Sequence, residues 1–436
     1  MFGRFRSDRS PGGVKGRRGS SAGVTRFAPG LLLTPAGLRT TGRVLRTLAG
    51  SAGDRGSEQR ETAGESLHPG HPGNPGSAEV GWGRCGRRGG TGQRFGARGA
   101  GPWQGAVTRM RTPSLTETLC VFQWVLTFLA MGVFFTLLTV YLLFTPLWPV
   151  SALYLAWLAM DRNTPERGGR RSRWVRSWRV WKGMRDYFPV TLVKTSKLSP
   201  KKNYILGYHP HGIMCFGAFC NFGTEANQFS RVFPGITPHL ATLNGLFRLP
   251  IFRDYLMSSG ACSVSRSSLR HLLEERGEGQ AVVIVVGGAA ESMTGRPGEH
   301  GVLLKNRQGF VRMALEHGAD LVPVYSFGEN DVYDQVVLEP DSWGNRLQRQ
   351  FRKLAGFAPC LFRGRGLVFS RSWGLLPFAR PVATVVGKPI AVKRMPNPPQ
   401  EEVDRYHTLY QEALLRLFDK HKTRYGLSKD TRLTIH

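Results

Sequence analysis

Cysteine is scarce in this sequence of 436 residues, and none of the six cysteines stands in a Cys-x-x-Cys pair. A zinc ribbon and a thioredoxin-like site are therefore excluded. Six scattered cysteines are also too few for a disulfide framework, so we expect free thiols facing a reducing cytosol. From residue 108 onward the chain contains no Gly-x-Ser-x-Gly, which argues against an α/β serine hydrolase. It has no phosphate loop of the nucleoside triphosphatase type either.

Acidic residues are also few, with 30 Asp and Glu against 60 Lys and Arg and a formal net charge of +30. Such an excess favours an anionic partner, which can be nucleic acid, a membrane surface or an anionic substrate. Residues 1–107 are rich in Gly, Arg, Ser and Pro and show no apolar periodicity. We expect this tail to be disordered and solvated, with a fainter alternative as an RNA-binding Arg-Gly segment. We expect no secretory signal in it, because its apolar stretches are too short.

Charge is absent altogether from Leu119 to Met160, a run of 42 residues. About 20 apolar residues cross a bilayer once as a helix, so the run is long enough for two passes or a re-entrant loop. Pro146 and Pro149 interrupt it, because proline lacks an N–H and clashes with the preceding turn. We expect a transmembrane or re-entrant hairpin over residues 116–160, with helices over 119–144 and 150–160. The alternative is a buried core hairpin of a soluble protein.

The flanks of this run are basic, with 13 basic and 2 acidic residues between Arg162 and Lys202. Lys and Arg beside membrane segments stay cytosolic, so we expect both termini in the cytosol. Residues 161–200 also carry Trp174, Trp178 and Trp181 at helical spacing between basic residues. Such a helix can lie in the lipid headgroup layer, or it can pack its indoles on the domain. The charge therefore suits a membrane surface, and we expect no nucleic acid.

Residues 201–436 are the globular domain, in which apolar runs alternate with helical patterns. We expect strands over 204–208, 281–286, 321–325 and 383–386, because continuous Val/Ile runs are typical of strands buried on both faces. Helices are expected over 267–275, over 310–317 with Gly318 as C-cap, and after Pro398-Pro399. This alternation predicts an α/β domain.

The first candidate site is His209-Pro210-His211-Gly212, directly after the first expected strand. Strand carboxyl ends are where α/β folds place their sites. An imidazole there can take a proton from a hydroxyl, and Gly212 lets a substrate approach the backbone. A metal pair and a purely structural role remain as alternatives for the two histidines.

The second candidate is Gly287-Gly288-Ala289-Ala290-Glu291, after the long Val-rich strand. Paired glycines let backbone amides face an anion, and Glu291 can orient an imidazolium. The alternative is a plain strand-to-helix turn with Glu291 in the first helical turn. Three further candidates could bind phosphate or be structural: Arg253, Arg266 and Arg365.

Taken in order, several segments resemble the type-two diacylglycerol acyltransferase family, which also contains monoacylglycerol and wax-alcohol acyltransferases. Besides the two candidates above they are Tyr187-Phe188-Pro189, Gly217-Ala218-Phe219-Cys220-Asn221-Phe222, Lys305-Asn306-Arg307-Gln308-Gly309-Phe310-Val311, Tyr325-Ser326-Phe327-Gly328-Glu329-Asn330, Arg363-Gly364-Arg365-Gly366 and Val385-Val386-Gly387-Lys388-Pro389-Ile390. The resemblance covers roughly residues 115–436 and leaves out the tail.

The resemblance implies an α/β acyltransferase-like domain and an enzyme of the endoplasmic reticulum and lipid droplets. It would move a fatty acyl group from acyl-CoA, as co-substrate, to diacylglycerol or monoacylglycerol, with no cofactor or metal. We expect His211 as general base, His209 shaping its loop and Glu291 as orienting acid. We expect substrate contacts from Gly212, Asn221, Gly287, Gly288, Arg253, Arg266 and Arg365. The distantly similar glycerophosphate acyltransferases use His-x-x-x-x-Asp, but Phe216 stands where His211 would need that acid.

Three alternatives remain open at this stage. Within the class, residues 287–292 look more like diacylglycerol enzymes, whereas the turn over residues 143–149 looks more like a monoacylglycerol relative. Outside it, the chain could be a nonenzymatic lipid-surface protein or a His-x-His metallohydrolase. A homo-oligomer also stays open.

Overall fold

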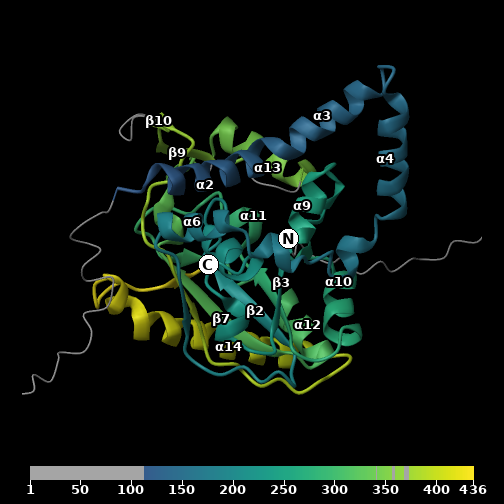
Figure 1. Ribbon diagram of the computed structural model, residues 1–436. Helices are drawn as coiled ribbons and strands as arrows, with labels where there is room; N and C mark the ends of the chain where they lie inside the picture. The colour runs from purple at the N-terminus through teal and green to yellow at the C-terminus, as the bar shows by residue number, and fades with distance from the viewer. Residues whose placement is uncertain (1–111, 340, 356–358, 368–372) are drawn as a thin grey trace, which may run out of the picture. The chain divides into compact units, whose positions relative to one another are not determined.

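The computed structural model describes residues 112–339, 341–355, 359–367 and 373–436 (Figure 1). The tail expected over residues 1–107 lies outside these ranges. The main sheet has the strand order β1-β11-β7-β2-β5-β3-β4. Its strands are β1 (Thr191–Lys194), β2 (Tyr204–His209), β3 (Thr237–Thr242), β4 (Ala261–Ser263), β5 (Gln280–Val285), β7 (Asp320–Phe327) and β11 (Ala383–Val386).

The sheet is mixed, as only β11 and β7 pair antiparallel. Five neighbouring strands run parallel, so their carboxyl ends meet at one edge. Smaller sheets are formed by β8 (Asp334–Val336), β9 (Leu361–Arg365) and β10 (Trp373–Gly374), and by β6 (Gly301–Val302) with β12 (Thr434–Ile435). The four expected strands are confirmed as β2, β5, β7 and β11, and the α/β expectation with them.

Helical segments surround the sheet. The α-helices are α2 (Leu115–Leu126), α3 (Gly132–Leu142), α4 (Trp148–Met160), α5 (Arg173–Arg176), α6 (Arg179–Tyr187), α7 (Phe216–Ala218), α8 (Phe229–Val232), α9 (Phe252–Ser258), α10 (Arg266–Arg270), α11 (Gly288–Glu291), α12 (Gly309–His317), α13 (Trp343–Ala355) and α14 (Gln400–His421). The π-helical turns are η1 (Thr127–Met131), η3 (Phe219–Gly223) and η5 (His271–Glu275), and the 3₁₀ turns are η2 (Thr164–Arg167), η4 (Asn244–Arg248), η6 (Glu329–Val332) and η7 (Lys422–Tyr425). Gly318 caps α12 in the left-handed conformation, as expected.

The two faces of the sheet carry separate hydrophobic cores, because successive side chains of a strand point to opposite faces. In β2, Leu206 and Tyr208 join a core that includes residues of α2, α6 and η3, whereas Ile205 joins one that includes residues of α10, α12 and α14. Figure 1 shows α12 and α14 below the sheet and α2 and α6 above it. The domain therefore has three layers, with strand ends free to carry a site at one edge.

The N-terminal apolar run begins at a capping box, in which Ser114 Oγ accepts from the Glu117 N–H and the Glu117 carboxylate accepts from the Ser114 N–H. Leu115–Leu142 is a 28-residue helical stretch, long and apolar enough to cross a membrane. Its first part is docked on the domain, since Val121, Trp124 and Val125 are buried. Trp124 stacks on Phe219, with ring centroids 3.8 Å apart. Only its second part, α3, stands clear of this core.

After α3 the chain turns at residues 143–147 and returns as α4, where Ser151 Oγ donates to the Thr139 carbonyl. Large apolar side chains on both helices and the turn are exposed, among them Leu137 (65%), Phe144 (85%) and Leu153 (74%). Contiguous exposed apolar surface of this kind marks a membrane or protein contact. The alternative of a buried core hairpin is therefore wrong for α3 and α4.

The tryptophan-rich segment over residues 161–200 forms two short helices, α5 and α6, rather than one. Trp181 is buried, donates through Nε1 to the Val175 carbonyl, and packs edge-on against Trp124. Trp178 stacks parallel to Trp181, whereas Trp174 is 73% exposed. The alternative that the indoles pack on the domain is therefore confirmed for Trp181. Of the three tryptophans, Trp174 alone has most of its surface exposed.

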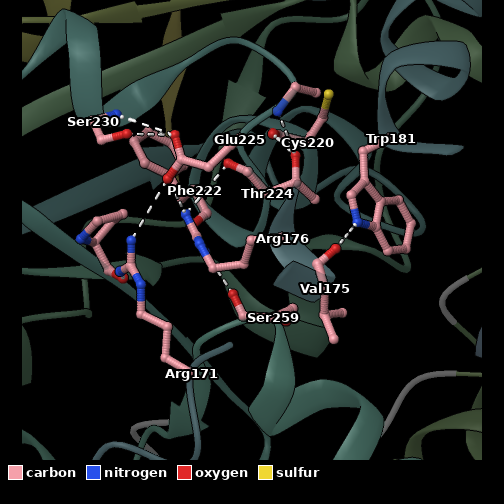
Figure 2. Close-up of polar contacts among 12 residues, drawn as sticks. Arg171, Val175, Arg176, Trp181, Cys220, Phe222, Thr224, Glu225, Ser230 and Ser259 are labelled. Carbon is pink, nitrogen blue, oxygen red and sulfur yellow. Dashed lines mark hydrogen bonds and ion pairs between the residues drawn. The ribbon is translucent and has the colours of Figure 1, made fainter. Parts of the chain in front are cut away.

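A buried arginine ties this segment to the domain (Figure 2). Arg176 is 1% exposed and donates to the backbone carbonyls of Phe222, Thr224 and Ser259. Its Nη2 also lies 3.1 Å from Glu225 Oε1. Burial lowers the pKa of Arg176, and Glu225 acts in the opposite direction. The guanidinium is tolerated in the interior because both terminal nitrogens, Nη1 and Nη2, donate to acceptors, whereas Nε has no partner.

Replacing Glu225 by alanine should destabilise the protein by about 3 kcal/mol, because it leaves the Arg176 cation buried without its carboxylate. Glu225→Gln should cost less, since the amide oxygen still accepts. The measurement is thermal unfolding of detergent-solubilised protein followed by tryptophan fluorescence. Glu412→Ala, which breaks an exposed pair with Arg416, is the matched control. Equal midpoints for Glu225→Ala and this control would contradict the account.

Candidate active site

The two candidate loops meet at the carboxyl edge of the sheet because β2 and β5 are parallel neighbours. The His211 N–H donates to Glu291 Oε1 at 2.6 Å, and the Leu303 N–H donates to Glu291 Oε2 at 2.6 Å. Glu291 therefore contacts the main chain of His211, not its ring as expected of an orienting acid. A Cβ at position 287 would collide with the Glu291 carboxylate, so Gly287 is required for this packing.

The His211 imidazole is fixed by its own loop. Nδ1 lies 2.8 Å from the Gly212 carbonyl, which can only accept, so Nδ1 carries the proton and Nε2 carries the lone pair. The Cys215 thiol lies 3.5 Å from Nδ1 and donates to the His211 carbonyl. Burial lowers the pKa of His211, with the Gly212 hydrogen bond opposing. The lowered pKa favours a neutral ring near pH 7.

His209 has different surroundings, although it stands two residues away. It is fully buried on the opposite face of β2, where Nε2 lies 3.0 Å from the Tyr410 hydroxyl. That hydroxyl donates to the Gly207 carbonyl, so it accepts from His209 Nε2–H. Burial lowers the pKa of His209 to about 3. His209 therefore stays neutral and attaches the base of the loop to α14, which is a structural role.

Glu329 is a second buried carboxylate below the same loop, and sequence reasoning did not single it out. Its Oε2 accepts from the Tyr208 hydroxyl at 2.7 Å and from the Gly217 N–H at 3.0 Å. Gly212, at a φ of +61°, packs so tightly that a Cβ there would lie 2.9 Å from Glu329 Cγ. Burial raises the pKa of both Glu291 and Glu329 to about 7. The loop over residues 210–217 is thus held by two carboxylates.

One sequence signal for Glu329 was its place in the polar segment Ser326–Asp331, which follows another strand. That strand, β7, pairs in parallel with β2, which brings the segment to the His211 loop. The motif resemblance also contained Glu329 without giving it a role.

An apolar cavity of about 390 Å³ opens beside the loop. His211, Cys215 and Gly288 line its polar end, together with Ser292. Most of the rest of its wall is apolar, with contributions from the α2–η1–α3 helix, from β3 to α9 and from β9, among them Trp124, Phe128, Leu129, Val133, Leu240, Leu243, Leu246, Leu249, Phe252, Leu256 and Phe362. The cavity therefore connects the imidazole with the base of the exposed helix α3, and its lining suits a hydrocarbon chain.

Of the other predicted substrate contacts, some border the cavity and some lie in the interior. Asn221 is buried and donates to Thr384 Oγ1 at 2.9 Å, which places it in the interior. Of the two glycines in the second loop, Gly288 borders the cavity and Gly287 packs on Glu291.

The three arginines predicted to bind phosphate have protein partners instead. Arg253 is fully buried and pairs with Asp161 at 2.9 Å. Arg266 pairs with Glu316 on the surface. Arg365 donates to the hydroxyls of Tyr187 and Thr118. None of the three lines the cavity, because each is drawn to an acid or hydroxyl that the fold places nearby.

Among the described residues, no group of three or more His, Cys, Asp or Glu side chains could hold a metal ion. The five cysteines in the same ranges are free thiols.

Comparison with known proteins gives concordant matches. The family profile described as Diacylglycerol acyltransferase matches residues 140–436. Diacylglycerol O-acyltransferase 2 of Danio rerio is 56% identical over 335 residues, covering 77% of this chain and 92% of that relative. The protein of the same name from Homo sapiens is 54% identical over 330 residues, covering 76% and 85%.

A further relative is 2-acylglycerol O-acyltransferase 3 of Homo sapiens, 54% identical over 339 residues, with 76% of this chain and 99% of that relative covered. Among solved structures, the crystal structure of the 1-acyl-sn-glycerophosphate acyltransferase from Thermotoga maritima aligns over 72% of this chain and 98% of its own. The TM-score of that alignment is 0.33, at 12% identity. The motif resemblance found in the sequence is confirmed by the profile match over more than half of the chain: the chain belongs to the diacylglycerol acyltransferase family.

Proposed function

We propose that this protein transfers a fatty acyl group from acyl-CoA to the free hydroxyl of diacylglycerol, which yields triacylglycerol and free CoA. The observation that supports this most directly is the neutral His211 imidazole at the polar end of an apolar cavity, in a chain of this family. An apolar cavity suits an acyl chain, and a neutral imidazole suits removal of a hydroxyl proton.

In the proposed reaction, His211 Nε2 takes the proton of the acceptor hydroxyl as its oxygen attacks the thioester carbonyl. The C–S bond then breaks, and the imidazolium returns the proton to the departing sulfur of CoA. The Gly212 carbonyl accepts from Nδ1–H throughout, so the ring keeps its orientation while it gains and loses the Nε2 proton. Glu291 and Glu329 keep the loop in place through the His211 and Gly217 amides.

The exposed helices α3 and α4 are the proposed membrane anchor. At 1.5 Å per residue, the 11 residues of α3 span about 16 Å and the 13 residues of α4 about 20 Å, both less than the ~30 Å hydrocarbon core. A re-entrant hairpin in one leaflet therefore fits better than two crossings. Its two ends lie on the cytosolic face, at the endoplasmic reticulum or a lipid droplet, beside dissolved diacylglycerol.

The proposed function is tested by a radiolabelled oleoyl-CoA assay on membranes that express the protein, with diacylglycerol, monoacylglycerol and a long-chain alcohol offered in parallel. We expect labelled triacylglycerol, above the level in membranes without the protein. No transfer to any acceptor would overturn the proposal and favour a nonenzymatic lipid-surface protein.

A second candidate acceptor is monoacylglycerol. The 54% identity to a 2-acylglycerol O-acyltransferase equals that to the diacylglycerol enzyme of the same organism. The same assay separates the two acceptors: early accumulation of labelled diacylglycerol from monoacylglycerol, at a kcat/KM above that for diacylglycerol, would select this second candidate.

A further inference from the structure

The turn that binds the second oxygen of Glu291 is itself bound by the residue after strand β12. The Leu303 N–H, which donates to Glu291 Oε2 at 2.6 Å, belongs to the same peptide group as the Val302 carbonyl. That carbonyl accepts from the His436 N–H at 2.9 Å. A trans peptide group is planar, with its N–H and C=O pointing in opposite directions. The hydrogen bond from His436 therefore sets the direction in which the Leu303 N–H points.

The backbone oxygen of His436 binds the other side of the same turn. It accepts from the Leu304 N–H at 3.0 Å and from the Lys305 N–H at 2.8 Å. The Leu304 side chain is fully buried, and the Leu304 carbonyl accepts from the Arg307 N–H at 2.9 Å, which closes the turn. Three hydrogen bonds of the His436 main chain thus surround the peptide group that reaches Glu291.

Strand β12 is held in place by its own neighbours. It pairs in parallel with β6, so that Ile435 lies beside Val302. The Thr434 N–H donates to the His300 carbonyl at 2.8 Å, and Leu433 is buried in the core that includes residues of α12 and α14. The main chain of the next residue is therefore fixed, although its side chain is exposed.

We propose that the main chain of His436 positions the His211 loop, acting through the Leu303 N–H and Glu291. The inference rests on the proposed function and extends the site to a residue that does not line the cavity. Glu291 connects the two segments, because Oε2 accepts from Leu303 and Oε1 accepts from the His211 N–H. If the Leu303 N–H turns away, the carboxylate loses one of its two amide donors, and the His211 amide loses a fixed acceptor.

Loss of the Leu303 hydrogen bond should be visible in the pH dependence of activity. Burial raises the pKa of Glu291 to about 7, whereas the Leu303 amide lowers it. The other groups that interact electrostatically with this carboxylate are the His211 amide, Arg307, Cys215 and Tyr325. Without the Leu303 donor the pKa of Glu291 should rise further, so activity should decrease at higher pH than in the unmodified protein. A general loss of stability would not move this pKa.

The first pair of variants removes a single hydrogen bond from the turn. Lys305 is the second residue of the Leu304–Arg307 turn, where proline is favoured, so Lys305→Pro should keep the turn and remove only the N–H. Lys305→Ala keeps that N–H and is the matched control, since the Lys305 side chain is exposed. We expect Lys305→Pro to lower kcat about 3-fold with oleoyl-CoA and diacylglycerol. The acidic decrease of activity should move to higher pH in Lys305→Pro and stay in place in Lys305→Ala.

The second pair tests all three hydrogen bonds together. Deletion of His436 removes them, whereas His436→Ala keeps the main chain and removes only an exposed imidazole. We expect the deletion to lower kcat about 10-fold, with the same shift in pH dependence. His436→Ala should stay within about 2-fold of the unmodified protein. In a Glu291→Gln background the deletion should add little, because both changes reach the His211 loop through the same carboxylate.

Thermal unfolding midpoints are recorded for all variants, and the Lys305 pair decides the matter if the deletion variant does not fold. An unchanged pH profile in Lys305→Pro, with losses that add to those of Glu291→Gln, would overturn the proposal and leave β12 as a stabilising strand only. Absence of any transfer by the unmodified protein would overturn the proposed function instead, so the two failures are distinguishable.

Discussion

Replacing His211 by alanine should lower acyl transfer by about 10²- to 10⁴-fold, the range that general-base groups contribute. The substitution removes the imidazole, whose Nε2 carries the lone pair, from the cavity wall and keeps the backbone N–H that donates to Glu291. The loop therefore keeps its two carboxylate contacts. The loss should fall on kcat with either acceptor, because the imidazole acts on the hydroxyl proton and not on the hydrocarbon chains.

The measurement is the initial rate with oleoyl-CoA and diacylglycerol in membranes, at matched protein amounts. His271→Ala is the control, since this imidazole lies in a surface pair with Glu275. Membrane association and the thermal midpoint are recorded for both variants. If His211→Ala retained more than a tenth of the activity while folded, the general base would have to be another group.

Much of this site follows from local sequence. His209-Pro210-His211-Gly212 stands after one Val/Ile-type strand and Glu291 after another, and parallel strands end at a common edge, so a contact between the two loops was predictable. The form of the contact was not. Which atom of His211 meets Glu291 depends on the turn after β5 and on Leu303, which no local pattern specifies.

The less predictable features depend on long-range pairing. Glu329 reaches Tyr208 across a sequence separation of 121 residues, and only because β7 lies beside β2. Arg253, beside Asp254 and Tyr255, was a candidate phosphate ligand, but Asp161, 92 residues earlier in the chain, forms an ion pair with it. Trp181 had the spacing of an interfacial indole, yet the docking of α2 buries it against Trp124. Charge and periodicity indicate what a side chain can do, whereas tertiary partners decide whether it stays free to do it.

The substitution Glu291→Gln should lower kcat about 10- to 100-fold and change the pH profile. A glutamine amide has one acceptor oxygen, so either the His211 or the Leu303 amide loses its partner, at a cost of about 1–3 kcal/mol. The His211 backbone then shifts, and the imidazole with it. Glu291 acts as a positioning residue, so a shape-conserving change reduces the rate without abolishing it.

The sign of the pH effect follows from the pKa of Glu291, which burial raises from 4.5 to about 7. Above pH 7 the carboxylate is ionised and both oxygens accept an N–H. Below pH 7 one oxygen is protonated and the His211 loop loses part of its support. Activity of the unmodified protein should therefore fall as pH decreases through about 7. In Glu291→Gln this loss of activity near pH 7 should be absent. The loss that remains should occur at lower pH and reflects protonation of His211, because burial lowers the pKa of its imidazole.

Folding stability should change in the opposite direction over the same range. The unfolded chain releases the Glu291 proton near pH 4.5 and the native protein near 7, so stability decreases as pH rises between these values. Glu329 has the same raised pKa, so Glu329→Gln is the companion variant for the activity profile.

If activity still fell near pH 7 in Glu291→Gln but no longer did so in Glu329→Gln, Glu329 would be the group that controls the pH dependence of activity. A decrease of activity near pH 7 in both variants would contradict control of the His211 loop by either carboxylate.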